Sequence, residues 1–266
     1  MPARTLGVAP AALACDKCAA FRMGTRFYIG AKSLRGDIAS YAKRFDLLEV
    51  MTGTSSATVP SMATLKRWRK GVPPHFAFTV VAGPSVAALR PGEALDKELA
   101  QTTAAADVLE ARNILLPTPA DVTPSAVWRD RLAKVAERFR RDVTNLVWEP
   151  RGVWEVEDAA VLARKLGLVL AVDAARDPVP LGPVAYSRLR ALGETRSFGA
   201  SALERVVSAI GVRRDAFVVL ETDGALAECK LLRRLAALPD QGDRKNATRV
   251  VRPRGSSVKV RDDEQE

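Results

Sequence analysis

The sequence predicts a (β/α)8 barrel, an α/β fold with eight parallel strands, and three observations carry this prediction. Eight short apolar runs recur between residues 27 and 222, each with the length and composition of a buried parallel strand. Segments with helical spacing of apolar residues separate most of these runs. The 266-residue chain, 47% hydrophobic, is long enough to bury one large core. A doubly wound sheet, the nearest alternative, usually has fewer strands.

The expected strands follow one another at regular intervals, with proline and glycine at the seams. They are FYIG (27–30), DLLEVM (46–51), FAFTVV (76–81), NILL (113–116), NLVWE (145–149), LVLAVD (168–173), VAYSRL (184–189) and FVVLET (217–222). Between them, apolar stripes such as Trp128, Leu132, Val135 and Phe139 predict helices that pack on the barrel. Only the connection that contains RDPVPLGP (176–183) lacks a helical pattern.

We expect three regions along the chain: a flexible leader over residues 1–26, the barrel over 27–239 and a disordered tail over 240–266. Residues 244–261 of the tail hold seven Lys or Arg and no acid, before DDEQE reverses the sign. This tail is either a solubilising extension or a contact for nucleic acid. In the leader, Cys15 and Cys18 form a lone C-x-x-C without the second pair of ligands that a zinc site needs.

The charge balance favours an anionic partner. The chain has 41 Lys and Arg against 31 Asp and Glu, a formal net charge of +10. The alternative is a charged, solvated surface that binds no such partner. Three cysteines make no disulfide framework, which favours a reducing cytoplasm. No apolar run approaches the roughly 20 residues that span a bilayer, so we expect no membrane partner. The sequence does not report the oligomeric state.

The candidate site lies at the carboxyl ends of the strands, because the βα loops of such a barrel converge there. Two carboxylates at these ends, Glu49 and Glu149, are the candidate catalytic residues. The other polar residues near these ends are candidates for substrate binding, with cations suited to an anionic group. They are Lys32, Arg151, Trp154, Asp173, Arg188, Arg190 and Glu221.

A purely structural role is the alternative for each of these residues. Glu49, Glu149 and Glu221 could be neutralised by Arg151 and Arg188 in an ion-pair network that closes the barrel, because buried charges must be paired.

The segment WEPRGVW (148–154) contains several of these candidates. Pro150 stops the strand and aims Arg151, and Gly152 lets the chain turn. Trp154 is either a stacking platform for a sugar or base, or a hydrophobic plug under the next helix.

No cofactor is predicted. The sequence has no G-x-G-x-x-G, G-x-x-x-x-G-K-[ST] or G-x-S-x-G motif, which excludes the dinucleotide, P-loop and serine-hydrolase classes. The single histidine, His75, precedes the third strand at the other end of the barrel, which excludes a His-rich zinc site at the mouth. A divalent Mg²⁺ or Mn²⁺ held by Glu49, Glu149, Asp173 and Glu221 stays open.

The motifs DLLEV, TLKRWRKGVPPHFAFTV, PTPAD, WEPRGVW and SRLRALG, in this order, resemble the YecE-like family, the proteins with domain of unknown function 72. The similarity covers residues 27–239 and is greatest to the archaeal-type version with W-E-P-R-G. It implies a TIM barrel that is loosely related to sugar isomerases. The positions that match mouth residues of the family are Glu49, Glu149, Arg151, Trp154 and Arg188.

The chain resembles a divergent member of that family. Val81 and Ala82 stand where the family has a lysine near the end of the third strand, and Pro117 stands where it has a glutamine. Arg190 replaces the histidine of the family's R-L-H-G.

Two functions follow from these observations. The first is an enzyme acting on a phosphorylated or otherwise anionic sugar-like substrate, with the cations holding the anion and Glu149 or Glu49 moving a proton. This enzyme needs a carboxylate with a raised pKa, although nearby cations lower the pKa of a carboxylate. The second is a degenerate barrel that binds an anionic ligand or nucleic acid without turnover.

Overall fold

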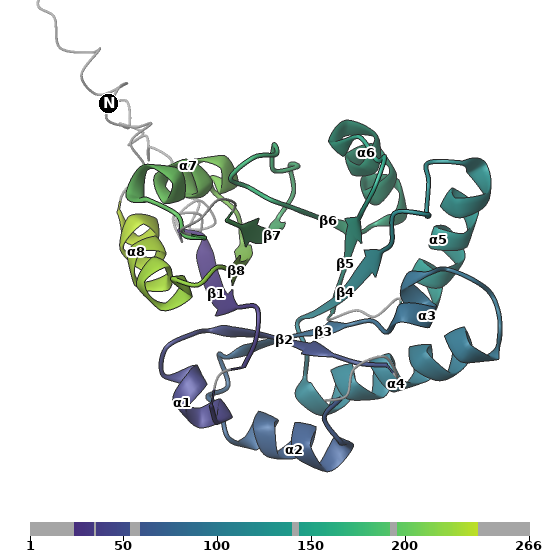
Figure 1. The fold of residues 1–266 in the computed structure, drawn as a ribbon, viewed down its shortest axis with the longest axis horizontal. Coiled ribbons are helices and arrows are strands. Elements are labelled where there is room, and N and C mark those ends of the chain that lie inside the picture. Colours follow the sequence, from purple (N-terminus) through teal and green to yellow (C-terminus); the bar gives the residue numbers. More distant parts are fainter. Residues whose placement is uncertain (1–23, 35, 54–58, 140–143, 192–195, 239–266) are drawn as a thin grey trace, which may run out of the picture.

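The strands form a closed parallel barrel. The computed structural model describes residues 24–34, 36–53, 59–139, 144–191 and 196–238. The eight strands pair in chain order, and β8 pairs with β1 to close the barrel (Figure 1). They are β1 (Arg26–Ala31), β2 (Leu47–Met51), β3 (Ala77–Val81), β4 (Asn113–Thr118), β5 (Asn145–Pro150), β6 (Val169–Val172), β7 (Val184–Arg190) and β8 (Asp215–Glu221). The predicted fold class is therefore confirmed, with strand ends shifted by one or two residues.

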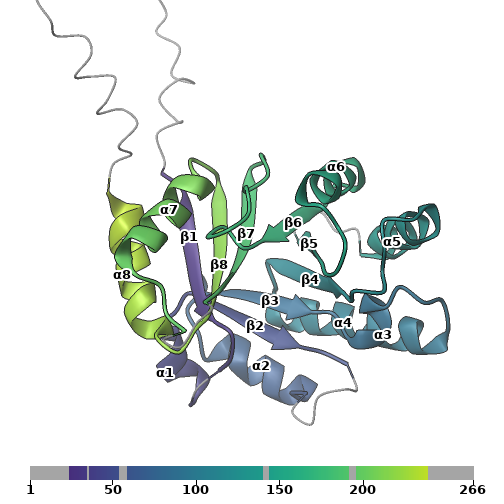
Figure 2. The ribbon, with the colours of Figure 1, turned by 45° about the horizontal axis from the view of Figure 1, so that its top comes forward.

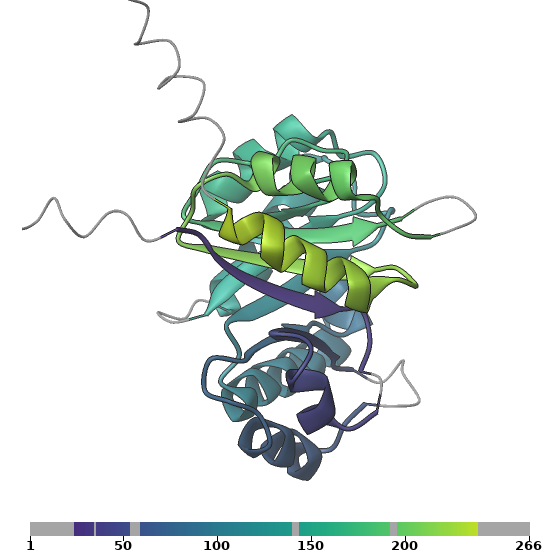
Figure 3. The same cartoon turned by 90° about the vertical axis from the view of Figure 1, so that its left-hand side faces the viewer.

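Helices cover the outside of the barrel (Figures 1 and 3). They are α1 (Ile38–Ala42), α2 (Met62–Lys70), α3 (Pro84–Ala87), α4 (Glu93–Leu109), α5 (Ala126–Arg138), α6 (Val156–Leu166), α7 (Ala200–Ile210) and α8 (Ala225–Ala237). The described residues 173–183 between β6 and β7 contain no helix, as the sequence predicts for this connection.

The strands bury both faces, so their side chains divide between two cores. Side chains that point outward, such as Ile29, Phe78 and Trp148, pack under the helices. Side chains that point inward, such as Leu47 and Val147, fill the middle of the barrel. Because side chains alternate along a strand, the residue two positions after an inward apolar residue also points inward, one layer nearer the mouth.

The amino-terminal end of the barrel lies opposite the mouth. Each strand starts there, and each following helix runs back toward it, so β1 begins and α8 ends at this end (Figure 2). The expected tail and the Cys15–Cys18 motif lie outside the described residues. Within the described part of the chain, no helix is both long and apolar enough to cross a membrane.

The turn after β5 is built by Gly152. Its φ of +85° is a left-handed conformation that favours glycine. A Cβ atom at this position would lie 2.8 Å from the carbonyl oxygen of Ala120. The close approach of these two segments fixes the backbone that follows Arg151, next to the barrel mouth.

Candidate functional site

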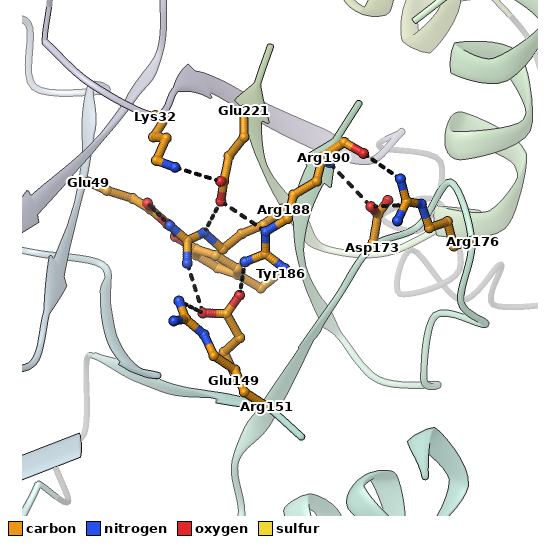
Figure 4. Close-up of polar contacts among 10 residues, drawn as sticks. All are labelled: Lys32, Glu49, Glu149, Arg151, Asp173, Arg176, Tyr186, Arg188, Arg190 and Glu221. Carbon is orange, nitrogen blue, oxygen red and sulfur yellow. Dashed lines mark hydrogen bonds and ion pairs between the residues drawn. The ribbon is translucent and has the colours of Figure 1, made fainter. Parts of the chain in front are cut away.

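A cluster of charged residues closes the carboxyl ends of four strands and the adjoining loops (Figure 4). The alternation of side chains produces it: in β7, Val184 and Tyr186 point inward in the apolar core and Arg188 follows one layer higher. Glu49 follows Leu47 and Glu149 follows Val147 in the same way. We define the mouth cluster as Lys32, Glu49, Glu149, Arg151, Tyr186, Arg188, Arg190 and Glu221.

Arg188 lies at the centre of the mouth cluster and contacts three carboxylates. Its Nη2 donates to Glu49 Oε2 at 3.0 Å and its Nη1 donates to Glu149 Oε2 at 2.8 Å. Its Nε lies 3.0 Å from Glu221 Oε1, an ion pair without hydrogen-bond geometry. The Arg188 side chain is only 10% exposed. One buried guanidinium therefore links strands β2, β5 and β8.

Three further cations surround this centre. Arg190 pairs with Glu149 through its Nη2, and its Nε lies 3.4 Å from Glu221 Oε1. Lys32 Nζ donates to Glu221 Oε2 at 3.0 Å. Arg151 is the most loosely held, with its Nη2 3.7 Å from Glu149 Oε2 and its side chain 56% exposed.

Tyr186 belongs to the site, although it was not among the residues predicted from the sequence. Its hydroxyl donates to Glu49 Oε1 at 2.6 Å, so both oxygens of this carboxylate are bound. Tyr186 lies in an apolar run and resembles a core aromatic residue there. Its position two residues before Arg188, on the same face of β7, is the signal that could have identified it.

Asp173 and Trp154 lie beside the mouth cluster. Asp173 accepts hydrogen bonds from the backbone N–H groups of Arg190 and Ala175, and Arg176 Nε lies 3.6 Å away, so it ties β6 to the end of β7. Trp154 donates its indole N–H to the Val122 carbonyl at 2.6 Å.

The ring of Trp154 also meets Trp148 edge-on, 4.9 Å between ring centroids. These contacts belong to a packed plug rather than to an open stacking surface.

The environment pushes the pKa values of two mouth carboxylates in opposite directions. Burial raises the pKa of Glu49, and this effect exceeds the opposing ones of Arg188 and the Tyr186 hydrogen bond. Burial also opposes ionisation of Glu221, but Arg188, Lys32 and Arg190 together hold its pKa below the ordinary value.

The mouth cluster does not fit a divalent metal. Arg188 occupies the space between the three carboxylates, where a shared cation would have to lie. Within the described residues, no group of three or more His, Cys, Asp or Glu is arranged to hold a metal ion. The guanidinium thus supplies the positive charge that these carboxylates need.

A small pocket adjoins the mouth cluster at β8. It has a volume of about 330 Å³ and is lined by Lys32 and Glu221 of the cluster, together with Arg44, Arg196 and Asp223. Tyr41, Leu220 and Ala225 add apolar surface. The pocket has the size of a site for a small ligand, and Glu221 faces it.

The family model of the protein family of unknown function DUF72 matches residues 21–252. The chain belongs to the DUF72 family. No curated protein matches it.

Solved structures of DUF72 proteins share the fold. A DUF72 protein of Enterococcus faecalis superposes with a TM-score of 0.64 at 14% identity, covering 80% of this chain and 96% of its own. One of Thermotoga maritima gives a TM-score of 0.59 at 17% identity, covering 79% and 98%. An L-ribulose 3-epimerase gives 0.54 at 15% identity, covering 88% and 100%. At these identities the similarity shows the fold.

Proposed function

We propose that the mouth of this DUF72 barrel transfers a proton to or from an anionic, sugar-like substrate. The proposal rests on two different environments within one cluster. Glu49 is buried, which raises its pKa, whereas Glu221 contacts Arg188, Lys32 and Arg190, which lower its pKa. Pairs of acids whose environments separate their pKa values are typical of acid–base sites. Glu49 is the proton carrier in this proposal, and Glu221 stays ionised.

Proton transfer needs a carboxylate with a raised pKa, whereas the cations of the mouth cluster lower the pKa of a nearby carboxylate. Glu49 has a raised pKa although Arg188 contacts it, because burial at the bottom of the mouth cluster outweighs the attraction of one guanidinium. The Tyr186 hydroxyl donates a hydrogen bond to Glu49. It therefore orients the Glu49 carboxyl group, and the strength of this bond depends on whether Glu49 is ionised.

The anionic group of the substrate would bind to the excess positive charge of the mouth cluster. The mouth cluster has one more cation than carboxylates. The cations are Arg188, Arg190, Lys32 and Arg151, and the carboxylates are Glu49, Glu149 and Glu221. Arg151 is the cation that is free to turn, because its side chain is more than half exposed and its ion pair is long. A planar guanidinium binds a carboxylate or phosphate through two parallel hydrogen bonds.

The pocket at β8 offers room for the uncharged part of the substrate. Glu221 and Lys32 belong to the mouth cluster and also line this pocket, so a ligand in the pocket can reach the edge of the ion-pair network. A sugar hydroxyl in the pocket can donate to Glu221, and a second one can accept from Lys32. The likeness in fold to an L-ribulose 3-epimerase agrees with a sugar-like substrate.

Exchange of substrate hydrogen with solvent tests the proposal. The protein is incubated in D₂O with a panel of sugar phosphates, sugar acids and neutral sugars, and deuterium uptake at carbon is followed by NMR. We expect uptake into a phosphorylated or acidic sugar, loss of uptake in Glu49→Gln, and unchanged uptake in Glu137→Gln. Glu137 is an exposed glutamate of α5 and serves as the matched control. Uptake that persists in Glu49→Gln would overturn the role of this residue.

Binding without turnover is the second candidate function. It is favoured by the observation that Glu49, Glu149 and Glu221 are all engaged in ion pairs. A sugar phosphate that raises the melting temperature, with no deuterium uptake into any compound of the panel, would favour this second function over the first.

A further inference from the structure

A large hollow at the amino-terminal end of the barrel has a strongly basic lining. It has a volume of about 970 Å³, and its charged residues are Arg26, Arg112, Arg164, Lys165, Arg214 and Asp215. We call it the basal pocket. It lies at the opposite end of the barrel from the mouth cluster, because these residues stand at strand starts or at the end of α6.

One carboxylate, that of Asp215, forms ion pairs with two of the five cations. Arg214 Nε donates to Asp215 Oδ2 at 2.8 Å, and Arg26 Nη2 lies 2.8 Å from Asp215 Oδ1. Both arginine side chains are more than half exposed, so each keeps donors that face solvent. Asp215 is buried, and its charge is already shared between these two partners.

The other three cations have no carboxylate partner within the described residues. Arg112 stacks on the ring of Tyr28 with its Cζ 4.9 Å from the centroid, which leaves its N–H edge available. Arg164 and Lys165 are exposed in the last turn of α6. Positive charge in a last helical turn complements the helix dipole, but this effect does not explain Arg112 or Arg26 at strand starts.

The chain continues from this same end of the barrel. The described chain ends at Leu238, just after α8, beside the start of β1 (Figure 2). In the sequence, residues 244–261 then carry seven Lys or Arg and no acid. The sequence that follows the described chain thus adds cations without acids, which favours a polyanion over a single small anion.

We propose that the basal pocket binds the phosphate backbone of a nucleic acid. The five cations line a concave surface of about 970 Å³, and three of them have no carboxylate partner among the residues that the structure describes. Neutralised phosphates release their condensed counterions, which drives binding without sequence readout. This site is independent of the proton chemistry proposed for the mouth.

The test measures binding of the full-length protein to a fluorescein-labelled oligothymidylate of about 20 nucleotides by fluorescence anisotropy, over a range of salt concentrations. The test variant is Arg164→Glu with Lys165→Glu. Its matched control is Lys66→Glu with Arg205→Glu, which makes the same change in net charge at exposed positions of α2 and α7 that do not line the pocket. Circular dichroism confirms that both variants are folded.

We expect the test variant to lose at least about tenfold in affinity, with a shallower salt dependence, because two phosphate contacts are removed. The control should lose much less. Equal losses in the two variants, or no loss in the test variant, would overturn the proposal, since binding would then follow net charge or another surface. Displacement of the oligonucleotide by equimolar tripolyphosphate would also overturn it and would assign the pocket to a small polyphosphate.

Discussion

Arg188 is the residue on which the mouth depends. It is buried and contacts Glu49, Glu149 and Glu221. Its removal would leave these three carboxylates close together without the guanidinium that balances their negative charge. Arg151 also pairs with Glu149, but through a long contact at an exposed position. Two arginines near one carboxylate thus differ in role because they differ in burial.

Alanine substitution separates these two roles. Arg188→Ala should lower the free energy of unfolding by about 3–5 kcal/mol, because buried carboxylates lose their partner. Arg151→Ala should lower it by less than about 1 kcal/mol, as for an exposed ion pair. Urea denaturation at neutral pH measures both. Similar losses in the two variants would show that Arg151 supports the fold rather than a ligand.

Glu221 should contribute stability that depends on pH. Its pKa in the folded protein lies below the ordinary value of 4.5, so its contribution is present above that pH and disappears as the pH falls through the folded pKa. Glu221→Gln removes this contribution. The difference in unfolding free energy between the parent and this variant should therefore shrink from about pH 7 to about pH 3. A constant difference over this range would contradict the lowered pKa.

At the scale of elements, the strands follow from the sequence more directly than the contacts between them. Runs such as NILL and FVVLET are too short for a typical helix, which favours buried strands, and they lie in β4 and β8. The partners of Glu49 could not be predicted in the same way, because Arg188 and Tyr186 come from β7, far away in sequence. The closure of the barrel brings them together. Trp154 had two possible roles in the sequence, and its contacts with Trp148 and the Val122 carbonyl favour the plug.

The turn after β5 gives a prediction for one element. Gly152→Ala should destabilise the protein through its positive φ and through contact of the new Cβ with the Ala120 carbonyl. Gly167→Ala is the matched control, because Gly167 also has a positive φ but nothing lies within 4 Å of a new Cβ. We expect a loss of about 1–2 kcal/mol in the control, from backbone strain alone. The loss in Gly152→Ala should be larger, and equal losses in thermal denaturation would rule out the steric contribution.

At the scale of the whole molecule, the two ends of the barrel have different electrostatic character. At the mouth, carboxylates and cations nearly balance and lie in one hydrogen-bonded network. At the amino-terminal end, the described residues that line the basal pocket include five cations and one carboxylate. The net charge of +10 known from the sequence predicts an anionic partner but not this division, because the fold determines which end each cation reaches.

Removal of residues 240–266 should leave the barrel intact. The described residues already close the barrel, with β1 and β8 paired from Arg26 and Asp215 to Ala31 and Leu220. The removed segment has no apolar periodicity with which to dock. We expect a melting temperature within about 2 °C of that of the full chain. A loss of several degrees would reveal a packed element in this segment.

In the proposed site, one ion-pair network holds two carboxylates at different protonation equilibria. A carbon-13 NMR titration of the glutamate carboxyl groups, assigned with Glu49→Gln and Glu221→Gln, measures this directly. We expect the resonance of Glu49 to titrate above the ordinary glutamate value of 4.5 and that of Glu221 to titrate below it. If both titrate together, or if Glu49 titrates below Glu221, the mouth cluster is a structural ion-pair network and the proposed proton transfer is wrong.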